Sequence, residues 1–394
     1  MKQFRVIACT LSVLVCLTGC TKKPTMDAGA EPDQEETLVI NDTHSDDGRM
    51  VVGISMPSQS LERWNRDGAF LKRQFEQEGC EVILSFGNDL IDHQIDGIYD
   101  MIERGADLLI ISPIDASSLE TVIHKAAEAA IPIISYDRLI LRSPHVDYYV
   151  SFDNYNVGRL QGQYIIDALD LNHTVDKTFY MEFVSGDPAD NNAKYFYNGA
   201  YDVLLPYIAT GELSILSGQK EFYQTATTSW SRSFAQERFE GILNSYYING
   251  RKLHAVCCAN DTTAMGVMDA IQEDYKHHNQ IVITGQDADE ANLKRIMDGK
   301  QSMTVYKALH NESVVTIALG MAILNGEKPG EELISNSNWD FECEYDTRSY
   351  DNGKKIVNSY LLSPIVITKE NIQEELIDKG IYEMDEQGYF HAVK

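Results

Sequence analysis

The sequence has few cysteines, and they form no pattern that binds metal or carries out redox chemistry. Only 7 of the 394 residues are Cys. They are Cys9, Cys16 and Cys20 near the start, and Cys80, Cys257, Cys258 and Cys343 in the body of the chain. The last four form no CxxC pair and match no zinc signature, so we expect no metal site. Export would allow their oxidation, but we expect mostly buried free thiols, because two of them lie in the apolar run LHAVCCA.

Basic residues are also scarce relative to acidic ones. The chain has 33 Lys and Arg against 60 Asp and Glu, which gives a formal net charge of −27. Such a chain repels the phosphates of nucleic acids and the headgroups of anionic lipids. We therefore expect no nucleic-acid partner. The simplest interpretation of the acidity is a solvated surface and not an acidic binding patch.

Long apolar runs are missing after the first twenty residues. No later stretch reaches the roughly 18 uninterrupted apolar residues that a membrane-spanning helix needs. The start, MKQFRVIACTLSVLVCLTGC, places basic residues before a short apolar run, which is typical of a secretory signal peptide. Its ending, LTGC, resembles the lipobox of bacterial lipoproteins. The resemblance implies a signal peptide over residues 1–19 and a lipid on Cys20. The alternative is an ordinary signal peptide with an incidental cysteine.

The segment 20–49 is polar, acidic and rich in turn-forming residues. Such a composition cannot build a hydrophobic core, so we expect the lipidated cysteine to be followed by a flexible tether. A flexible chain of this length has an r.m.s. span of roughly 30 Å. We therefore expect an exported protein that reaches the membrane only through its lipid anchor. The sequence leaves open whether it faces the periplasm or the extracellular side.

From residue 50 onward, short apolar runs alternate with amphipathic stretches. The runs are MVVGISM, EVILSF, ADLLIIS, IPIISY, KTFYMEFVS, LHAVCCA and IVITGQ. This alternation predicts an α/β fold with parallel sheets flanked by helices on both faces. The body is long for one core and comfortable for two lobes. A last run, SYLLSPIVIT, contains a proline and is predicted to be an edge strand, and residues 335–352 have no clear period and are read as loop or hairpin.

Polar side chains follow the predicted strands at the points where the strands end. They are PSQSLERW after the first run, Asp137 and Arg138 after IPIISY, DPADNNA after YMEFVSG, Asn260 and Asp261 after AVCCA, Asp287 after IVITGQ, and Lys307 after SMTVY. In open α/β sheets, ligands bind beyond the carboxyl ends of the strands. A single such residue is often only a helix cap, but six strand ends of this kind predict a binding site.

An ordered set of motifs resembles the type I periplasmic binding proteins of ABC sugar importers. The motifs are LERW at 61–64, SYDRLI at 135–140, SFDN at 151–154, GDPADNNAKYF at 186–196, ANDTTAMG at 259–266, TGQDAD at 284–289, TVYK at 304–307 and SYLLSPIVITKEN at 359–371. The resemblance covers roughly residues 50–382 and is nearest to the xylose-binding and multiple-monosaccharide-binding branch.

The resemblance implies two Rossmann-like lobes joined by three hinge crossovers, which close around a ligand. The crossovers are expected near 152–155, 304–308 and 355–362. The first lobe would comprise residues 50–153 and 308–355, and the second would comprise residues 154–307 and 356–394. A monomer without a cofactor is expected.

The resemblance also implies ten sugar-binding residues. They are Arg63, Trp64, Asp137, Arg138, Asp190, Asn192, Trp230, Asn260, Asp287 and Lys307. Their chemistry fits a sugar, because each buried hydroxyl needs a partner and the flat tryptophan faces suit the C–H faces of the ring. Alternatives remain: a structural Asp137–Arg138 ion pair, core packing for either tryptophan, a solvated Lys307, and a helix cap at Asn260.

The function implied is that of a substrate-binding lipoprotein of an ABC importer. It would capture a monosaccharide of the xylose, arabinose, glucose or galactose type and deliver it to the transmembrane permease subunits. The stretch SQS at 58–60 leaves pentose and hexose unresolved. An alternative partner is a chemoreceptor or sensor kinase, to which the loaded protein would present its sugar. The sequence does not separate these two outputs.

An enzyme is a remoter alternative. A glycosidase would take two of the carboxylates Asp137, Asp190 and Asp287, but Arg138 and Lys307 should keep them ionised, which leaves no general acid. The adjacent His277 and His278 are interpreted as a solvated helix end. A DNA-binding repressor is excluded by export and acidity. We therefore expect neither catalysis nor a bound metal.

Overall fold

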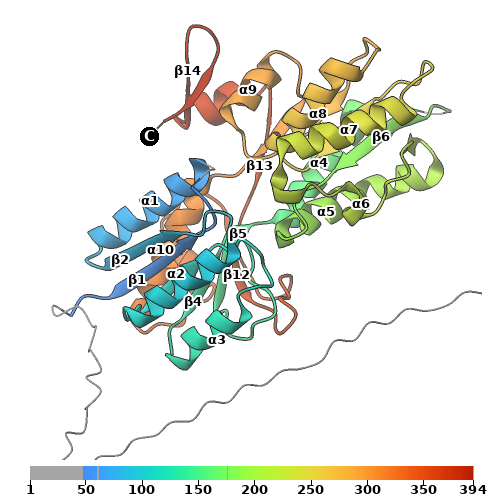
Figure 1. Ribbon diagram of the computed structural model, residues 1–394. Helices are drawn as coiled ribbons and strands as arrows, with labels where there is room; N and C mark the ends of the chain where they lie inside the picture. Colours follow the sequence, from blue (N-terminus) through green and yellow to red (C-terminus); the bar gives the residue numbers. More distant parts are fainter. Residues whose placement is uncertain (1–47, 60–61, 175, 394) are drawn as a thin grey trace, which may run out of the picture. The chain divides into compact units, whose positions relative to one another are not determined.

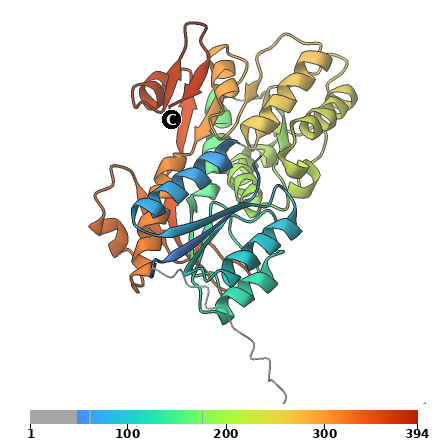
Figure 2. The same ribbon diagram turned by 60° about the vertical axis from the view of Figure 1, so that its left-hand side comes forward.

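The computed structural model describes residues 48–59, 62–174 and 176–393. The expected signal peptide, Cys20 and almost all of the expected tether lie outside the described residues. Strands and helices alternate along the described chain, as the sequence predicts (Figures 1 and 2). No helix within these residues has the length and apolarity that crossing a membrane requires.

The first lobe is built on a seven-stranded sheet with the order β11-β12-β5-β4-β3-β1-β2. Its strands are β1 (Val51–Met56), β2 (Glu81–Phe86), β3 (Leu108–Ile111), β4 (Ile133–Tyr136), β5 (Tyr148–Phe152), β11 (Cys343–Asp346) and β12 (Asn358–Leu362). All neighbours are parallel except β11, which runs antiparallel to β12. Strands β1, β3 and β4 are buried along their whole length, as expected for parallel strands covered on both faces.

Helices cover both faces of this sheet. They are α1 (Glu62–Gln77), α2 (Ile91–Glu103), α3 (Glu120–Glu128), α10 (Leu309–Leu324) and the short α11 (Glu332–Asn336). Leu71 on α1 and Val315 on α10 pack into the core on one face, and Met101 on α2 and Val122 on α3 pack into the core on the other. Their apolar residues recur at helical spacing, which is why these segments form helices with one buried side.

The second lobe is built on the parallel sheet β7-β6-β8-β9. The amide of Val305 donates to the carbonyl of Gly285, which extends this sheet to β10, and β10 pairs antiparallel with β13. The strands are β6 (Phe179–Val184), β7 (Leu213–Ser214), β8 (Ala255–Cys258), β9 (Val282–Ile283), β10 (Met303–Tyr306) and β13 (Ile365–Thr368).

Helices also flank the second sheet, and two of them approach each other closely. The helices are α4 (Asn154–Ala168), α5 (Asn191–Thr210), α6 (Phe222–Thr225), α7 (Arg232–Tyr246), α8 (Asp261–Asp274) and α9 (Glu290–Met297), with a 3-10 turn at Thr228–Trp230 and a π turn at Gln373–Ile377. A Cβ atom on Gly158 of α4 would lie 1.9 Å from the carbonyl oxygen of Phe196 on α5. Only glycine permits this approach, which packs α5 directly against α4.

The chain passes between the lobes three times. It leaves β5 for α4 at residue 153, leaves β10 for α10 at 307–308, and leaves β12 for β13 at 363–364. Lys307 therefore lies in one of the connections. The fold predicted from the sequence, two parallel-sheet lobes flanked by helices, is confirmed.

Two expectations about the C-terminal third were wrong. The run SYLLSPIVIT is not one edge strand, because β12 lies between β5 and β11 of the first sheet while β13 belongs to the second lobe. The lobe boundary was predicted at residue 356 and the crossover near 355–362. In the structure the chain leaves the first lobe only after β12, at 363–364. Pro364 has no N–H to continue the β12 ladder, so the chain changes sheet there. The end of the chain forms a hairpin of β14 (Tyr382–Met384) and β15 (Phe390–Ala392) that the sequence did not indicate.

Candidate functional site

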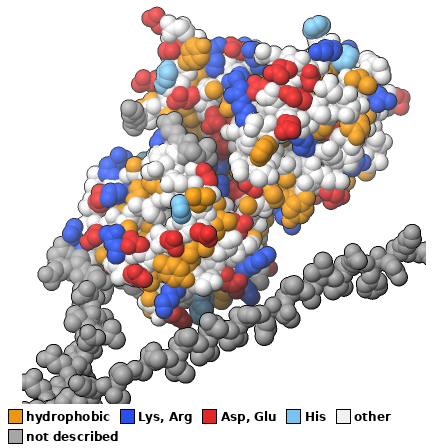
Figure 3. Space-filling view, viewed as in Figure 1, with side chains coloured by type: hydrophobic (Ala, Val, Ile, Leu, Met, Phe, Trp, Pro, Cys, Tyr) orange, Lys and Arg blue, Asp and Glu red, His pale blue; other side chains and the backbone are white. Residues whose placement is uncertain are grey.

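A cavity of about 560 Å³ is lined by residues of both lobes. This volume falls in the range of small-molecule sites. In Figure 3 the surface is hollowed between the lobes, and charged side chains are visible in the hollow. All ten residues expected from the sequence line the cavity. They are Arg63, Trp64, Asp137, Arg138, Asp190, Asn192, Trp230, Asn260, Asp287 and Lys307.

Asp137 is presented by a strained turn directly after β4. Its φ of 58° lies in the left-handed region, which costs free energy for a residue with a side chain. Its carbonyl oxygen accepts hydrogen bonds from Tyr149 Oη at 2.8 Å, Ser151 Oγ at 2.8 Å and Asn192 Nδ2 at 2.7 Å. Its amide donates to the carbonyl of Val150 at 2.8 Å. These bonds hold the turn, so the side chain projects into the cavity from a fixed position.

Cations surround the Asp137 carboxylate. Arg63 Nη2 donates to Asp137 Oδ1 at 2.7 Å, and Lys307 Nζ lies 3.9 Å from the same oxygen. Lys307 Nζ also lies 3.5 Å from Asp287 Oδ1. Burial alone would raise the pKa of Asp137, but the charges of Arg63, Lys307 and Arg138 outweigh burial and hold this pKa below its usual range. Asp137 is therefore a charged hydrogen-bond acceptor.

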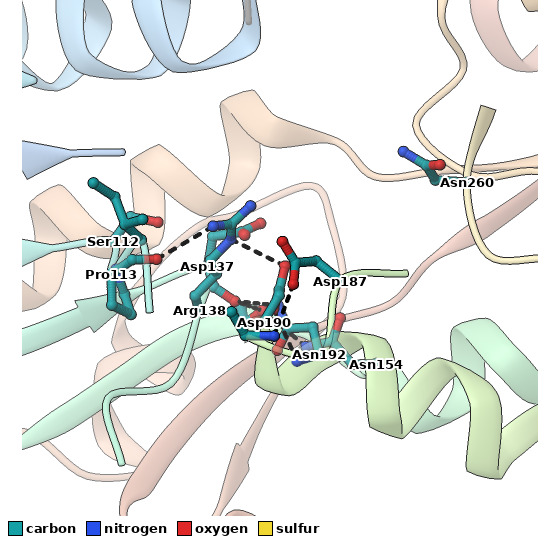
Figure 4. Close-up of polar contacts among 12 residues, drawn as sticks. Ser112, Pro113, Asp137, Arg138, Asn154, Asp187, Asp190, Asn192 and Asn260 are labelled. Carbon is teal, nitrogen blue, oxygen red and sulfur yellow. Dashed lines mark hydrogen bonds and ion pairs between the residues drawn. The ribbon is translucent and has the colours of Figure 1, made fainter. Parts of the chain in front are cut away.

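Figure 4 shows a second ion pair, between Arg138 and Asp190. Arg138 Nε lies 3.0 Å from Asp190 Oδ2, and Arg138 Nη1 donates to the carbonyl of Pro113 at 3.3 Å. Asp190 also caps α5, because its Oδ1 accepts from the amide of Asn192 at 2.9 Å. Burial raises the pKa of Asp190 more than Arg138 lowers it. Arg138 therefore offsets only part of the effect of burial on the pKa of Asp190.

Two tryptophans provide aromatic walls, one from each lobe. Trp64 belongs to the core of the first lobe and also lines the cavity, with the Arg63 guanidinium carbon 4.2 Å from its ring centroid. Trp230 lies against Gly186, where a Cβ atom would come within 1.9 Å of the indole ring. Among the described residues, neither indole N–H has a hydrogen-bond acceptor.

Asn260 lines the same cavity but lies apart from the cluster around Asp137, Arg138 and Asp190 (Figure 4). Its Oδ1 accepts from the amide of Thr263 at 3.0 Å and so caps α8, which is the structural alternative weighed from the sequence. Its Nδ2 donates to Asp287 Oδ2 at 3.4 Å. The side chain therefore serves as a helix cap and as part of the cavity wall.

Several further residues line the cavity without having been predicted. They include Arg66, Phe196, Gln286, Asp289, Glu290 and Tyr382. Burial, with a further contribution from Asp287, raises the pKa of Asp289 to about 7. Arg66 follows Arg63 by one helical turn, and Asp289 lies within the quoted motif TGQDAD, so both could have been found from spacing. Tyr382 could not have been predicted, because nothing in the sequence around it links the C-terminal hairpin to the cavity.

Two more carboxyl groups are buried behind the cavity wall. Asp67 Oδ2 lies 3.8 Å from Arg63 Nη2, and burial raises the pKa of Asp67 to about 6. Glu312 on α10 is fully buried, and burial, together with the charge of Asp137, raises its pKa well above the usual range. The wall around Asp137 and Arg63 therefore carries several acids of different proton affinity.

Within the described ranges, no group of three or more His, Cys, Asp and Glu side chains is arranged to hold a metal ion. The described cysteines are free thiols. Cys80, Cys257 and Cys258 are buried and Cys343 is partly buried, which agrees with the expected buried thiols.

The periplasmic binding protein domain family matches residues 52–328. The chain belongs to this family. A multiple sugar-binding periplasmic protein of Azospirillum brasilense is 37% identical over 335 residues, which cover 84% of this chain and 89% of the relative. The D-xylose-binding periplasmic protein of Escherichia coli is 30% identical, over 89% of this chain and 96% of the relative. The chain is thus a type I member of the xylose-binding and multiple-sugar-binding branch, as its motifs predicted.

A solved relative supports the same family. An ABC transporter solute-binding protein from Clostridium phytofermentans, with bound β-D-glucose, has 42% identity and a TM-score of 0.78. The match covers 84% of this chain and 98% of that protein. A carbohydrate transporter solute-binding protein from Chloroflexus aurantiacus, in complex with D-glucose, has 30% identity and a TM-score of 0.73 over 85% of this chain and 97% of that protein.

Proposed function

We propose that this chain is the substrate-binding component of an ABC importer for monosaccharides. It captures one sugar between two closing lobes and presents it to the membrane permease. The observation that carries the proposal is the joint placement of five carboxylates, four cations and two tryptophans around one cavity. The names of the relatives, which are sugar-binding periplasmic proteins and solute-binding proteins with bound glucose, support it.

The side chains supply the partners that a sugar needs. Asp137, Asp190 and Asp287 accept hydrogen bonds from sugar hydroxyls. The charged nitrogens of Arg63, Arg138 and Lys307 donate to the hydroxyl oxygens, and bonds that involve a charged group are the stronger kind. The charged groups are already paired with one another, so they stay satisfied until a ligand arrives. The Trp64 and Trp230 faces then cover the apolar faces of the ring.

The binding energy required is within reach of one monosaccharide. Such a sugar has about 12 non-hydrogen atoms, so micromolar affinity, about −8 kcal/mol, needs roughly −0.7 kcal/mol per atom. This lies below the ceiling for very small ligands. A single cleft of this kind can therefore hold its sugar tightly without further contacts.

Closure of the two lobes around a ligand follows from the way the binding residues are distributed between the lobes. Trp64 and Asp137 belong to the first lobe, while Asp190 and Trp230 belong to the second. A ligand that touches both sets binds the closed arrangement better than the open one, and so shifts the population toward closure. The closed form is the one that we expect the permease to recognise, and the role is binding and not catalysis.

Attachment to the membrane through Cys20 is part of the proposal. The lipobox-like LTGC supports it. A Cys20→Ser variant expressed in cells should lose incorporation of labelled fatty acid and appear in the soluble fraction. Equal membrane association of the variant and the wild type would refute the anchor without affecting the binding proposal.

Calorimetric titration of residues 48–394 tests the binding proposal. We would use xylose, arabinose, glucose, galactose, ribose and fucose with the wild type, with Arg138→Ala and with Arg104→Ala. Arg104 is a surface residue that pairs with Asp100 outside the cavity, so it is a matched control for loss of an arginine. We expect micromolar binding of at least one sugar, lost in Arg138→Ala and kept in Arg104→Ala. A folded wild type that binds none of them would overturn the monosaccharide proposal.

A further inference from the structure

The turn that carries Asp287 is held in an unusual conformation. Asp287 has φ 101° and Ala288 has φ 55°, so two consecutive residues with side chains lie in the left-handed region. Such conformations cost free energy and persist only where the surroundings fix them. Ala288 is fully buried, so its backbone groups must also find partners inside the protein.

Three amides of this turn are held by neighbouring segments of the second lobe. The bonds run from Asp287 N to Val305 O at 2.9 Å, from Ala288 N to Thr304 Oγ1 at 3.2 Å, and from Asp289 N to Asp261 Oδ2 at 2.9 Å. The carbonyl oxygen of Ala288 has a different partner. It accepts a hydrogen bond of 2.8 Å from Tyr382 Oη, which comes from the C-terminal hairpin.

The C-terminal hairpin is packed onto this part of the lobe. Tyr382 is 6% exposed and shares a hydrophobic cluster with Ala288, Leu293 and Phe390. The amide of Ala392 donates to Glu290 Oε1 at 2.8 Å, directly after the turn. In Figure 1 the β14 hairpin lies next to α9, which begins at Glu290. The hairpin is therefore hydrogen-bonded both to Ala288 and to Glu290, in the segment that follows Asp287.

The same tyrosine also forms part of the cavity wall. Tyr382 lines the cavity together with Asp287, whose carboxylate lies 3.5 Å from Lys307 Nζ and 3.4 Å from Asn260 Nδ2. The Tyr382 hydroxyl is used by Ala288, so the tyrosine acts on the site through the backbone. Without this bond the turn keeps the hydrogen bonds of its three amides but loses the one at the Ala288 carbonyl, so we expect the Asp287 carboxylate to be held less firmly against its partners.

We propose that Tyr382 is a positioning residue for the Asp287 carboxylate, which makes the C-terminal hairpin part of the sugar-binding apparatus. The proposal rests on the proposed monosaccharide function for the role of Asp287, but the bracing of the turn can be measured without a sugar. It gives the C-terminal hairpin a specific task.

Tyr382→Phe removes the hydroxyl and keeps the ring. Tyr360→Phe is the matched control, because Tyr360 Oη donates the same kind of bond, at 2.8 Å, to the carbonyl of Gly330 in the first lobe. Tyr360 is a core residue and does not line the cavity. We expect the dissociation constant for the sugar to rise roughly tenfold in Tyr382→Phe, because a buried carbonyl loses its partner, and to stay unchanged in Tyr360→Phe.

A double-mutant cycle separates positioning from general destabilisation. Asp287→Asn weakens the group through which Tyr382 acts, so adding Tyr382→Phe to Asp287→Asn should raise the dissociation constant by less than twofold. A full tenfold loss in both backgrounds would show that Tyr382 acts independently of Asp287 and would overturn the proposal.

Amide hydrogen exchange on the sugar-free protein completes the test. We expect a peptide spanning residues 285–290 to exchange faster in Tyr382→Phe and at the wild-type rate in Tyr360→Phe. Unchanged exchange in Tyr382→Phe would overturn the proposal, whatever the sugar affinities. If the wild type binds no sugar and Tyr382→Phe still speeds exchange, the monosaccharide function fails while the bracing of the Asp287 turn stands.

Discussion

Arg63 of α1 and Asp137 at the end of β4 are joined by a hydrogen-bonded ion pair of 2.7 Å inside the wall of the cavity. Their side chains are only 18% and 4% exposed. The same guanidinium group lies 3.8 Å from Asp67. Buried charges are tolerated only when they are paired. Arg63 therefore pairs with two carboxylates, and in the proposed complex it also donates to a sugar hydroxyl.

Loss of Arg63 should destabilise the protein strongly even without a sugar. Arg63→Ala leaves Asp137 with Lys307, 3.9 Å away, and removes the main cation beside Asp67. We expect the free energy of unfolding to fall by about 3 kcal/mol, as for other broken buried pairs. Urea unfolding at pH 7 measures it. Arg104→Ala breaks only half-exposed ion pairs on the surface, so it should lower the free energy of unfolding by less than about 1 kcal/mol. Equal losses in the two variants would contradict a buried role for Arg63.

Gly186 should be required for the Trp230 wall. A Cβ atom on residue 186 would lie 1.9 Å from the indole ring, so Gly186→Ala must push Trp230 out of place. We expect sugar affinity to fall roughly tenfold through loss of the aromatic face, measured by calorimetry. Gly241→Ala is the control, because a Cβ atom there meets nothing within 4 Å. Unchanged affinity in Gly186→Ala would show that the sugar does not contact Trp230.

The carboxyl group of Asp67 should make stability depend on pH. Burial raises its pKa from an ordinary value near 3.8 to about 6. The folded chain therefore holds this proton more tightly than the unfolded chain does. The resulting stabilisation is complete below about pH 4 and is lost as the pH rises through about 6. Across this window the wild type should lose about 3 kcal/mol of stability relative to Asp67→Asn.

Urea unfolding of both proteins between pH 3.5 and 7.5 measures the Asp67 effect. Taking the difference between wild type and variant at each pH cancels the contribution of carboxyl groups that the substitution does not touch. A difference that stays constant with pH, or that shifts in favour of the wild type as the pH rises, would contradict a buried Asp67 with a raised pKa.

The described thiols should be unreactive in the folded protein. Burial raises the pKa of Cys257 and of Cys343 to about 12, and it raises the pKa of Cys80 as well. Because the thiolate is the reactive form, an aromatic disulfide reagent at pH 8 should label residues 48–394 slowly. The same chain unfolded in guanidinium should react at all of its cysteines at once. A fast phase in the folded protein would contradict the buried thiols.

The binding residues were predictable because of a property of parallel sheets. Parallel strands end on the same edge, so residues that follow apolar runs far apart in sequence meet in space. Asp137 follows such a run in the first lobe and Asp287 follows one in the second. The cavity brings the ends of both sheets together, and both carboxylates lie near Lys307, which is in a connection between the lobes. The family resemblance supplied the residues that lie outside this pattern, such as Trp230.

The parts that could not be predicted depend on long-range packing. Nothing local marks Tyr382 as the partner of Ala288, because the bond joins the tail to a distant turn. The division of SYLLSPIVIT between two sheets was missed because both halves are equally apolar. The depth at which Asp190 is buried, which raises its pKa, also depends on packing and could not be read from the sequence.

The most direct test of the account is a crystal structure of residues 48–394 with the tightest-binding sugar. The account predicts one monosaccharide between Trp64 and Trp230, with its hydroxyls within hydrogen-bond distance of Asp137, Arg138 and Asp190. A sugar bound elsewhere on the chain, or one in the cavity that touches residues of a single lobe, would contradict it.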